Sequence, residues 1–251
     1  MPDSAAQAAP TECVILLHGL GRTAASMLWL ARDLRQDGFL VVNQNYPSRS
    51  DAIPALSHKV HAAIMRCEAL VLAGKANQNA QVNASREAIR ISFVTHSMGA
   101  ILLRSYFANP DFLRPNHIQF QRAVLLGPPN QGSEIVDLMM SRWYFKLANG
   151  PAGIALGTAP DGYLSSLPSL PMQFGVIAGV ATKQNWLLPK LPMPHDGKVS
   201  VASTHLAGET AHLQVPVKHT WLPSDVKVRK HVIFFLRNGI FSSEAGAGTS
   251  E

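Results

Sequence analysis

The sequence is poor in charge and has no long apolar run. Only 15% of its residues are charged and 47% are hydrophobic, which excludes a disordered chain and leaves enough apolar material for one large core. No stretch reaches the roughly 18 uninterrupted apolar residues of a membrane-spanning helix. Lys and Arg exceed Asp and Glu by 22 to 16, a modest excess that does not indicate nucleic-acid binding.

Cysteine is also scarce. The two cysteines, Cys13 and Cys67, form no CxxC or Cys/His zinc spacing. We therefore expect neither a disulfide framework nor a structural zinc site. Each cysteine falls within an apolar pattern, so we interpret both as small buried side chains.

Neither end of the sequence contains a recognisable targeting signal or a pattern typical of a folded element. Met1 to Thr11 has neither a basic region nor an apolar core of the kind found in secretory signals, so we expect a cytoplasmic protein, although a processed or trimmed secreted chain would look the same. The ends at 1–10 and 242–251 are rich in Ala, Ser and Gly, and we expect them to be unstructured.

What the sequence does contain is a series of short apolar runs separated by helical patterns. The runs predict strands at 13–17, 39–43, 88–94, 123–126, 174–180 and 213–217. Apolar residues at helical spacing predict helices within 24–36, 51–73, 99–107 and 224–237. Strands without alternation, separated by helices, indicate a mostly parallel sheet covered on both faces. We predict a single α/β domain over residues 11–241.

One segment departs from this regular pattern. Residues 133–172 are rich in Gly and Pro and carry Trp143, Tyr144 and Phe145 together. An insertion of this length between two core strands is often a lid or a binding wall, with an ordinary helix and connection as the alternative. Trp143 and Phe145 are therefore candidate substrate-binding residues.

The strongest local signal is Thr95-His96-Ser97-Met98-Gly99. It follows an apolar strand and precedes a helix, the context of a nucleophile elbow that exposes a serine hydroxyl above a sheet. Gly99 fits the small residue that this turn requires, whereas Thr95 stands where glycine is usual. Ser97 is thus a candidate nucleophile, and a helix N-cap is the alternative interpretation.

A second glycine-containing turn, His18-Gly19-Leu20-Gly21, follows the first strand. Acyl transfer needs two N–H groups directed at the oxyanion, and the backbones of Leu20 and Met98 are the candidates. The stretch 19–24 also matches a dinucleotide-binding fingerprint. That interpretation needs an acidic residue at the end of the second strand, and positions 43–45 are Asn, Gln and Asn.

A serine nucleophile needs a base and an orienting carboxylate. Among 10 histidines, His219 follows the last predicted strand at the edge where parallel sheets bind ligands; His205 is the reserve. Asp196, in an Asp-Gly turn, is the candidate acid, and Asp161 is the second choice. The order Ser97, Asp196, His219 is typical of α/β-hydrolases.

These motifs, together with GPPNQGS (127–133) and DGKVS (196–200), resemble the α/β-hydrolase fold family, in particular small bacterial lipases and serine esterases. The resemblance implies a Ser97–His219–Asp196 triad, with Leu20 and Met98 as the oxyanion hole. It implies a small-molecule or lipid ester as substrate and neither metal nor cofactor. An acyltransferase with the same triad and a non-catalytic binding protein remain alternatives. Membrane contact is not indicated, and oligomeric state is open.

Overall fold

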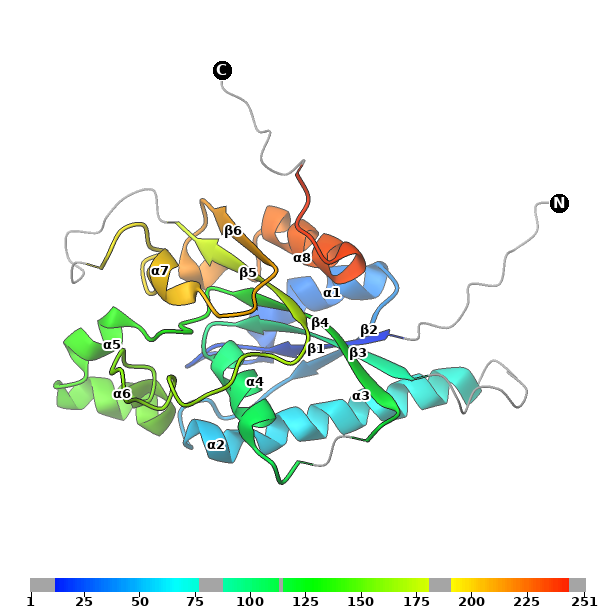
Figure 1. The fold of residues 1–251 in the computed structure, drawn as a ribbon, viewed down its shortest axis with the longest axis horizontal. Coiled ribbons are helices and arrows are strands. Elements are labelled where there is room, and N and C mark those ends of the chain that lie inside the picture. The colour runs from blue at the N-terminus through cyan, green and yellow to red at the C-terminus, as the bar shows by residue number, and fades with distance from the viewer. Residues whose placement is uncertain (1–11, 77–87, 113–114, 181–190, 244–251) are drawn as a thin grey trace, which may run out of the picture.

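The computed structural model describes residues 12–76, 88–112, 115–180 and 191–243, and the predicted tails lie largely outside them. Its centre is one six-stranded sheet in the order β2-β1-β3-β4-β5-β6, with every neighbouring pair parallel (Figure 1). The predicted α/β fold class is confirmed. None of the helices in the described ranges is long and apolar enough to cross a membrane.

The strands follow the apolar runs, because a strand buried on both faces has no polar alternation. They are β1 (Glu12–Leu17), β2 (Leu40–Gln44), β3 (Ile89–His96), β4 (Ile118–Leu126), β5 (Gln173–Gly179) and β6 (Ala211–Val215). Strand β6 ends two residues earlier than predicted. Pro216 follows it and has no N–H to continue the ladder.

Helices cover both faces of the sheet, and short 3-10 turns (η) accompany them (Figure 1). They are η1 (Ala24–Met27), α1 (Leu28–Gln36), α2 (Ile53–Leu56), α3 (His58–Ala76), α4 (Met98–Ala108), α5 (Glu134–Met139), α6 (Trp143–Ile154), α7 (Val201–Thr204), η2 (His219–Trp221) and α8 (Val226–Asn238). The helical patterns predicted at 24–36 and 51–73 are therefore each divided in two. Most of the predicted loop at 74–86 lies outside the described residues.

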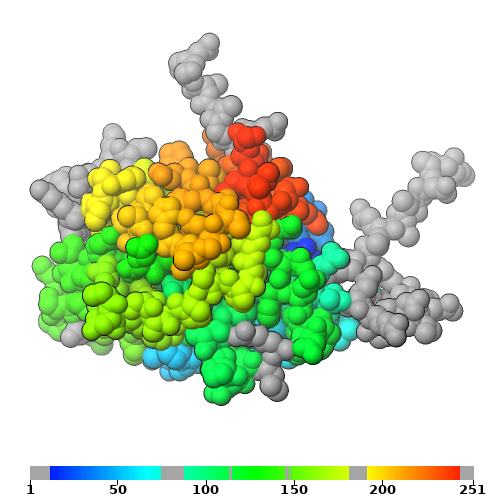
Figure 2. All heavy atoms as spheres, in the orientation of Figure 1, coloured from blue at the N-terminus to red at the C-terminus, as the bar shows by residue number. Residues whose placement is uncertain are grey.

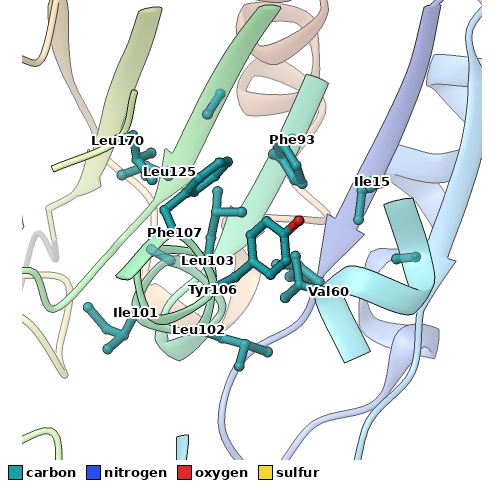
Figure 3. Close-up of a cluster of buried hydrophobic side chains, with 14 of the residues drawn as sticks. Ile15, Val60, Phe93, Ile101, Leu102, Leu103, Tyr106, Phe107, Leu125 and Leu170 are labelled. Atoms are coloured by element: carbon teal, nitrogen blue, oxygen red, sulfur yellow. The ribbon is translucent and has the colours of Figure 1, made fainter. Parts of the chain in front are cut away.

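The core has one layer on each side of the sheet. On one face, α2, α3 and α4 pack side chains such as Tyr106 and Val60 against Phe93 and Ile15 of the sheet (Figure 3). On the other face, α1 and α8 bury a second cluster against alternate residues of the same strands. The helices thus fix the strands so that all their carboxyl ends meet at one edge, toward α5, α6 and α7 (Figure 1).

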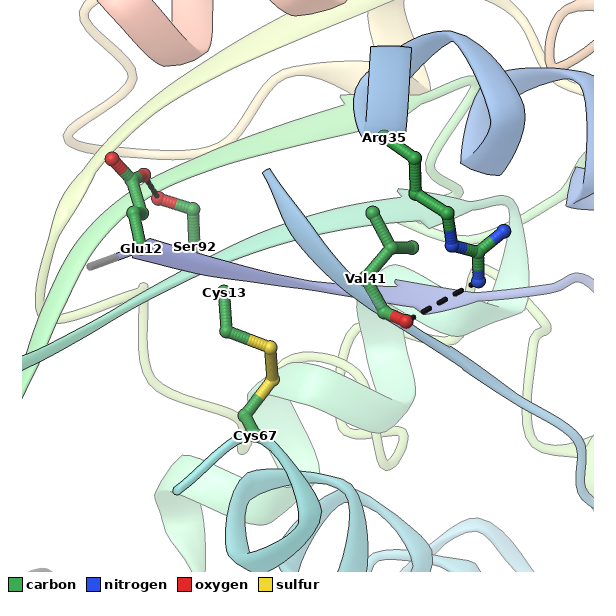
Figure 4. The surroundings of a disulfide bond; sticks show 6 residues. All are labelled: Glu12, Cys13, Arg35, Val41, Cys67 and Ser92. Atoms are coloured by element: carbon green, nitrogen blue, oxygen red, sulfur yellow. Dashed lines mark hydrogen bonds between the residues drawn. A yellow bond between two sulfur atoms is a disulfide. The ribbon is translucent and has the colours of Figure 1, made fainter. Parts of the chain in front are cut away.

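The expectation about the cysteines is wrong in one respect. Both are fully buried, as expected, but they form a disulfide that joins β1 to α3 (Figure 4). Their Cα atoms are 5.7 Å apart, across 54 positions of sequence. Packing of α3 on the sheet brings the two side chains together, and no local motif announces that long-range contact.

The segment between β4 and β5 contains α5 and α6 and lies beside residues 191–205 at one end of the molecule (Figure 2, green and yellow). Buried Arg104 of α4 holds its later part, donating hydrogen bonds to the carbonyls of Leu164, Leu167 and Pro168. Loss of hydration lowers the pKa of Arg104 to about 10. The guanidinium therefore stays charged at neutral pH, and its carbonyl partners compensate its burial.

Candidate active site

Ser97 occupies the sharp turn between β3 and α4. Its φ of 54° is the one positive value found for a non-glycine residue among those described. This conformation is strained, and such strain is concentrated at functional positions. Its N–H donates to the carbonyl of Leu126 at 2.9 Å, which ties the turn to β4.

The residues on either side of Ser97 show how the turn fits the sheet. A methyl group at Gly99 would lie 2.6 Å from the carbonyl oxygen of Leu17, so only glycine lets α4 start this close to β1. Thr95 is fully buried within β3. Its hydroxyl oxygen has no hydrogen-bond partner among the described residues. The fold therefore accommodates threonine where glycine is usual.

Contacts of the His18 side chain fix the His18–Gly21 turn in place. The buried ring of His18 stacks on Tyr46 with centroids 4.0 Å apart. Its Nδ1–H donates to the carbonyl of Gly19, and its Nε2 accepts the N–H of Tyr46. Burial lowers the pKa of His18, in agreement with a neutral ring that fixes the turn. Leu20 thereby faces the same cavity as Ser97.

Met98, the other candidate oxyanion donor, is the first residue of α4 and is fully buried. The N–H groups of a helix's first turn have no partner inside the helix and carry partial positive charge. The start of α4 therefore offers donors beside Ser97.

Asp196 and His219, far apart in the sequence, meet at the carboxyl ends of β5 and β6. Nδ1–H of His219 donates to Oδ2 of Asp196 at 2.6 Å, with both side chains buried. The other carboxylate oxygen of Asp196 accepts the N–H groups of Lys198 and Val199 at 2.9 and 2.8 Å. The carboxylate is thus fixed on both sides, and it orients the imidazole.

Gly127 makes room for this pair. It has a φ of 53°, and a methyl group on it would lie 3.1 Å from both Asp196 Oδ2 and His219 Nδ1. Any side chain here would crowd the hydrogen bond between Asp196 and His219. The first glycine of the GPPNQGS stretch therefore serves the Asp196–His219 contact, a role that its sequence context does not reveal.

His96 also contributes to the site, which sequence reasoning missed. Its Nε2–H donates to the backbone carbonyl of His219 at 3.0 Å. Burial, and next the charge of His219, lower the pKa of His96 well below its usual range. A neutral His96 thus links the serine turn to the backbone of His219. Its position directly before Ser97 is the only signal that could have indicated this.

A cavity of about 350 Å³ connects these elements. Ser97, His219 and Leu20 line it together with mostly apolar side chains, namely Ile135, Val136, Leu156, Pro129 and Val199. Asp196 stands behind His219. The structure therefore brings together the predicted serine, base and acid and one predicted oxyanion residue, with Met98 next to the serine in the chain.

The remaining candidates lie elsewhere. Trp143, at the start of α6, is 75% exposed and does not line the cavity. The side chain of Phe145 is outside the described part of the structure. Asp161, the reserve acid, lies in the connection after α6 and does not line the cavity either.

Two cations at the cavity were not foreseen. Arg22 and Lys198 both line it. Loss of hydration, followed by the positive charge of Arg22, lowers the pKa of Lys198. The two like charges therefore act on one another beside the serine.

One group of side chains could hold a metal ion. His205, Glu209 and His212 offer ligand atoms within 4.8 Å of one another, and the structure contains no other such group in its described residues. His205 contacts Glu209 and stacks on His212. His205, the reserve base, thus contacts the other two residues, and none of the three lines the cavity beside Ser97.

Comparison with known proteins finds similar solved structures but no similar sequences among protein families or curated proteins. No protein-family description and no curated protein matches the sequence. The lipase BlEst2 of Bacillus licheniformis, in mature form, is similar over 94% of this chain and 93% of its own, with 17% identity and a TM-score of 0.58. A metagenomic carboxyl esterase, MGS0156, matches over 86% and 66%, with 16% identity and a TM-score of 0.53.

The phospholipase PlaB of Legionella pneumophila is similar over 77% of this chain, with 17% identity and a TM-score of 0.53. The match spans 45% of PlaB, so it concerns less than half of that protein. At these identities the likeness is one of fold. The chain has the α/β-hydrolase fold that its motifs indicate.

Proposed function

We propose that this protein is a serine hydrolase that cleaves carboxylic esters through an acyl-enzyme. One observation carries the proposal: Ser97, on a strained turn, shares a cavity with His219, whose Nδ1–H is bonded to buried Asp196. The fold shared with a lipase, an esterase and a phospholipase supports it.

The proposed first half-reaction forms the acyl-enzyme. Ser97 Oγ attacks the ester carbonyl carbon, and its proton moves to Nε2 of His219, the nitrogen opposite the Asp196 contact. Asp196 stabilises the resulting imidazolium. N–H groups of Leu20 and Met98 receive the oxyanion, and each such donor typically lowers the barrier by ~3 kcal/mol. The C–O bond of the alcohol then breaks as His219 returns the proton to the leaving oxygen.

The second half-reaction releases the acid. Water attacks the acyl carbon and gives its proton to His219, which then protonates Ser97 Oγ as the acyl–serine bond breaks. The residues invoked require no metal and no organic cofactor. The apolar lining of the cavity favours an acyl chain over a polar group.

The direct kinetic test is a burst experiment with p-nitrophenyl butyrate. We expect an initial release of p-nitrophenol equal to the enzyme concentration, because an acyl-enzyme accumulates when its hydrolysis is slow. Ser97→Ala should abolish both the burst and the turnover. Ser92→Ala is the matched control, since Ser92 is a buried serine of β3, the strand before the turn, and its hydroxyl group donates to Glu12. Turnover retained by Ser97→Ala would overturn the proposal.

A further inference from the structure

Two hollows at the carboxyl edge of the sheet are lined by cations and, among the described residues, by no carboxylate. The catalytic cavity has Arg22 and Lys198 in its wall. A second, more open groove of about 440 Å³ is lined by Arg22, Arg49 and Lys59, together with neutral residues. Arg22 belongs to both walls and therefore stands between the serine and the open groove.

No residue in the part of the chain that the structure describes neutralises the charge of Arg22. Its Nε is buried and has no hydrogen-bond partner, and Arg22 forms no ion pair with any described residue. Asp196, the acidic group of the neighbouring loop, is committed to His219 and to two backbone N–H groups. A buried guanidinium N–H without a partner is costly, and an incoming anion would satisfy it.

Arg49 lies directly against the turn that carries Leu20. A methyl group on Gly21 would come within 2.5 Å of Nη2 of Arg49. The N–H of Gly21 donates to Ser48 Oγ at 2.9 Å, which holds the Ser48–Arg49 stretch to this turn. The cationic groove therefore begins at the candidate oxyanion loop.

We propose that the substrate is a carboxylic ester whose alcohol part carries a phosphate or a similar anionic group, which Arg22 and Arg49 bind while the acyl chain occupies the apolar cavity. This inference rests on the proposed function and names its substrate class. Arginine presents a planar set of donors that matches phosphate oxygens, and such charge-assisted bonds are stronger than neutral ones. Lys59 and Lys198 add positive charge on either side.

In the proposed reaction only the carboxylic ester bond is cleaved. Ser97 takes the acyl group, and the phosphorylated alcohol leaves with the proton supplied by His219. Water then releases the free acid. The phosphate ester bonds remain intact, so the products are a carboxylic acid and a phosphorylated alcohol.

The test compares two soluble esters that differ by one phosphate group, monobutyryl glycerol 3-phosphate and monobutyryl glycerol. We expect a kcat/KM at least about tenfold higher for the phosphorylated ester, because charge-assisted hydrogen bonds from arginine to phosphate are stronger than neutral ones. The preference should decrease as salt is added, because screening weakens exposed charge pairs. Glycerol 3-phosphate should inhibit hydrolysis of the neutral ester.

Variants of single cationic residues test which side chains cause the preference for the phosphorylated ester. Arg22→Gln and Arg49→Gln should each lower the ratio of the two kcat/KM values about tenfold, mainly through KM, and should weaken inhibition by glycerol 3-phosphate. Lys227→Gln removes an exposed charge from α8, on the opposite face, and should change neither. A parallel pair of dodecanoyl esters in mixed micelles distinguishes a lipid headgroup from a small soluble phosphate.

The outcomes separate this inference from the proposed function. A preference in the soluble pair supports it, and a similar preference in the micellar pair extends it to lipids. Equal rates on the two soluble esters, or a ratio that Arg22→Gln leaves unchanged, would overturn it while hydrolysis by Ser97 still stood. A preference confined to micelles would also overturn it, because a charged surface alone explains that result.

Discussion

The loops that carry Asp196 and His219 and the helices α5 and α6 border the same cavity, but they are built differently. The loops bury their polar groups and give them fixed partners, at 2.6 Å between Asp196 and His219. By contrast, α5 and α6 leave Leu138, Trp143 and Leu147 between 50% and 79% exposed. The proposed chemistry thus lies on loops fixed by hydrogen bonds, here called the rigid part, whereas α5 and α6, which expose these apolar side chains, are called the loosely packed part.

The largest expected effect comes from breaking the rigid part. Asp196→Asn should lower kcat about 10⁴-fold with little change in KM, because an amide at this position no longer holds the imidazole in its productive tautomer. Steady-state kinetics on a neutral ester, with circular dichroism to confirm folding, measures this. Asp225→Asn is the control, since Asp225 caps α8 and asparagine caps equally well. A loss below tenfold would contradict the assigned acid.

The next effect concerns stability. Removing the disulfide by Cys13→Ser should lower the free energy of unfolding by about 4 kcal/mol, the value expected for closing a loop of some 54 residues. Activity per folded molecule should persist, because Cys13 lies at the amino end of β1 (Figure 4) and neither cysteine lines the cavity. Urea unfolding with and without a reductant measures it, and equal stability in both would contradict the bond.

The same bond bears on the expected cytoplasmic location. Disulfides are rare in reducing compartments. Counting the free thiols of protein isolated under a thiol-blocking reagent therefore tests that expectation. Two blocked thiols would favour a reducing compartment, and none would favour an oxidising one.

The next prediction concerns pH: the free energy of unfolding should decrease as the pH is lowered. The pKa of buried His96 lies well below 6.5 in the folded protein, so between those values the unfolded chain binds more protons and stability falls as the pH falls. The pKa values of His18, His212 and His231 are lowered as well. His96→Gln should reduce the loss of unfolding free energy between pH 7.5 and 5.5 by about 1 kcal/mol.

Urea denaturation at the two pH values measures this contribution. Val94→Ala, on the same strand, is the control for destabilisation without titration and should leave the pH dependence unchanged. An equal pH dependence for wild type and His96→Gln would contradict a neutral, buried His96.

The smallest effect should come from the loosely packed part. Trp143→Ala should change stability by less than about 0.5 kcal/mol, because the side chain is 75% exposed. If α6 controls access for acyl chains, long-chain esters should lose a few-fold in rate relative to short ones. Trp29→Ala, on α1 across the sheet, is the matched control. An unchanged chain-length profile would remove Trp143 from the substrate wall.

The sequence predicted those features of the fold that depend on local patterns of residues. Apolar runs predicted the strands because a doubly covered parallel sheet buries both faces, and the turn around Ser97 was marked by Gly99. His219 and Asp196 were placed by topology, since loops after successive parallel strands converge at one edge.

Contacts that depend on packing were missed. The Cys13–Cys67 bond needs α3 in place against β1, and the role of Gly127 depends on two loops from other strands. Arg22 and Lys198 come from turns more than 170 positions apart, so nothing in the sequence shows that their charges share one cavity.

The most direct test of the account is to treat the protein with a fluorophosphonate and map the modified peptide by mass spectrometry. The account predicts one adduct per molecule, on Ser97, that is lost in Ser97→Ala and strongly slowed in His219→Ala, while Ser92→Ala reacts like the wild type. An unmodified wild-type protein, or an adduct on another residue, would contradict an activated serine at this turn.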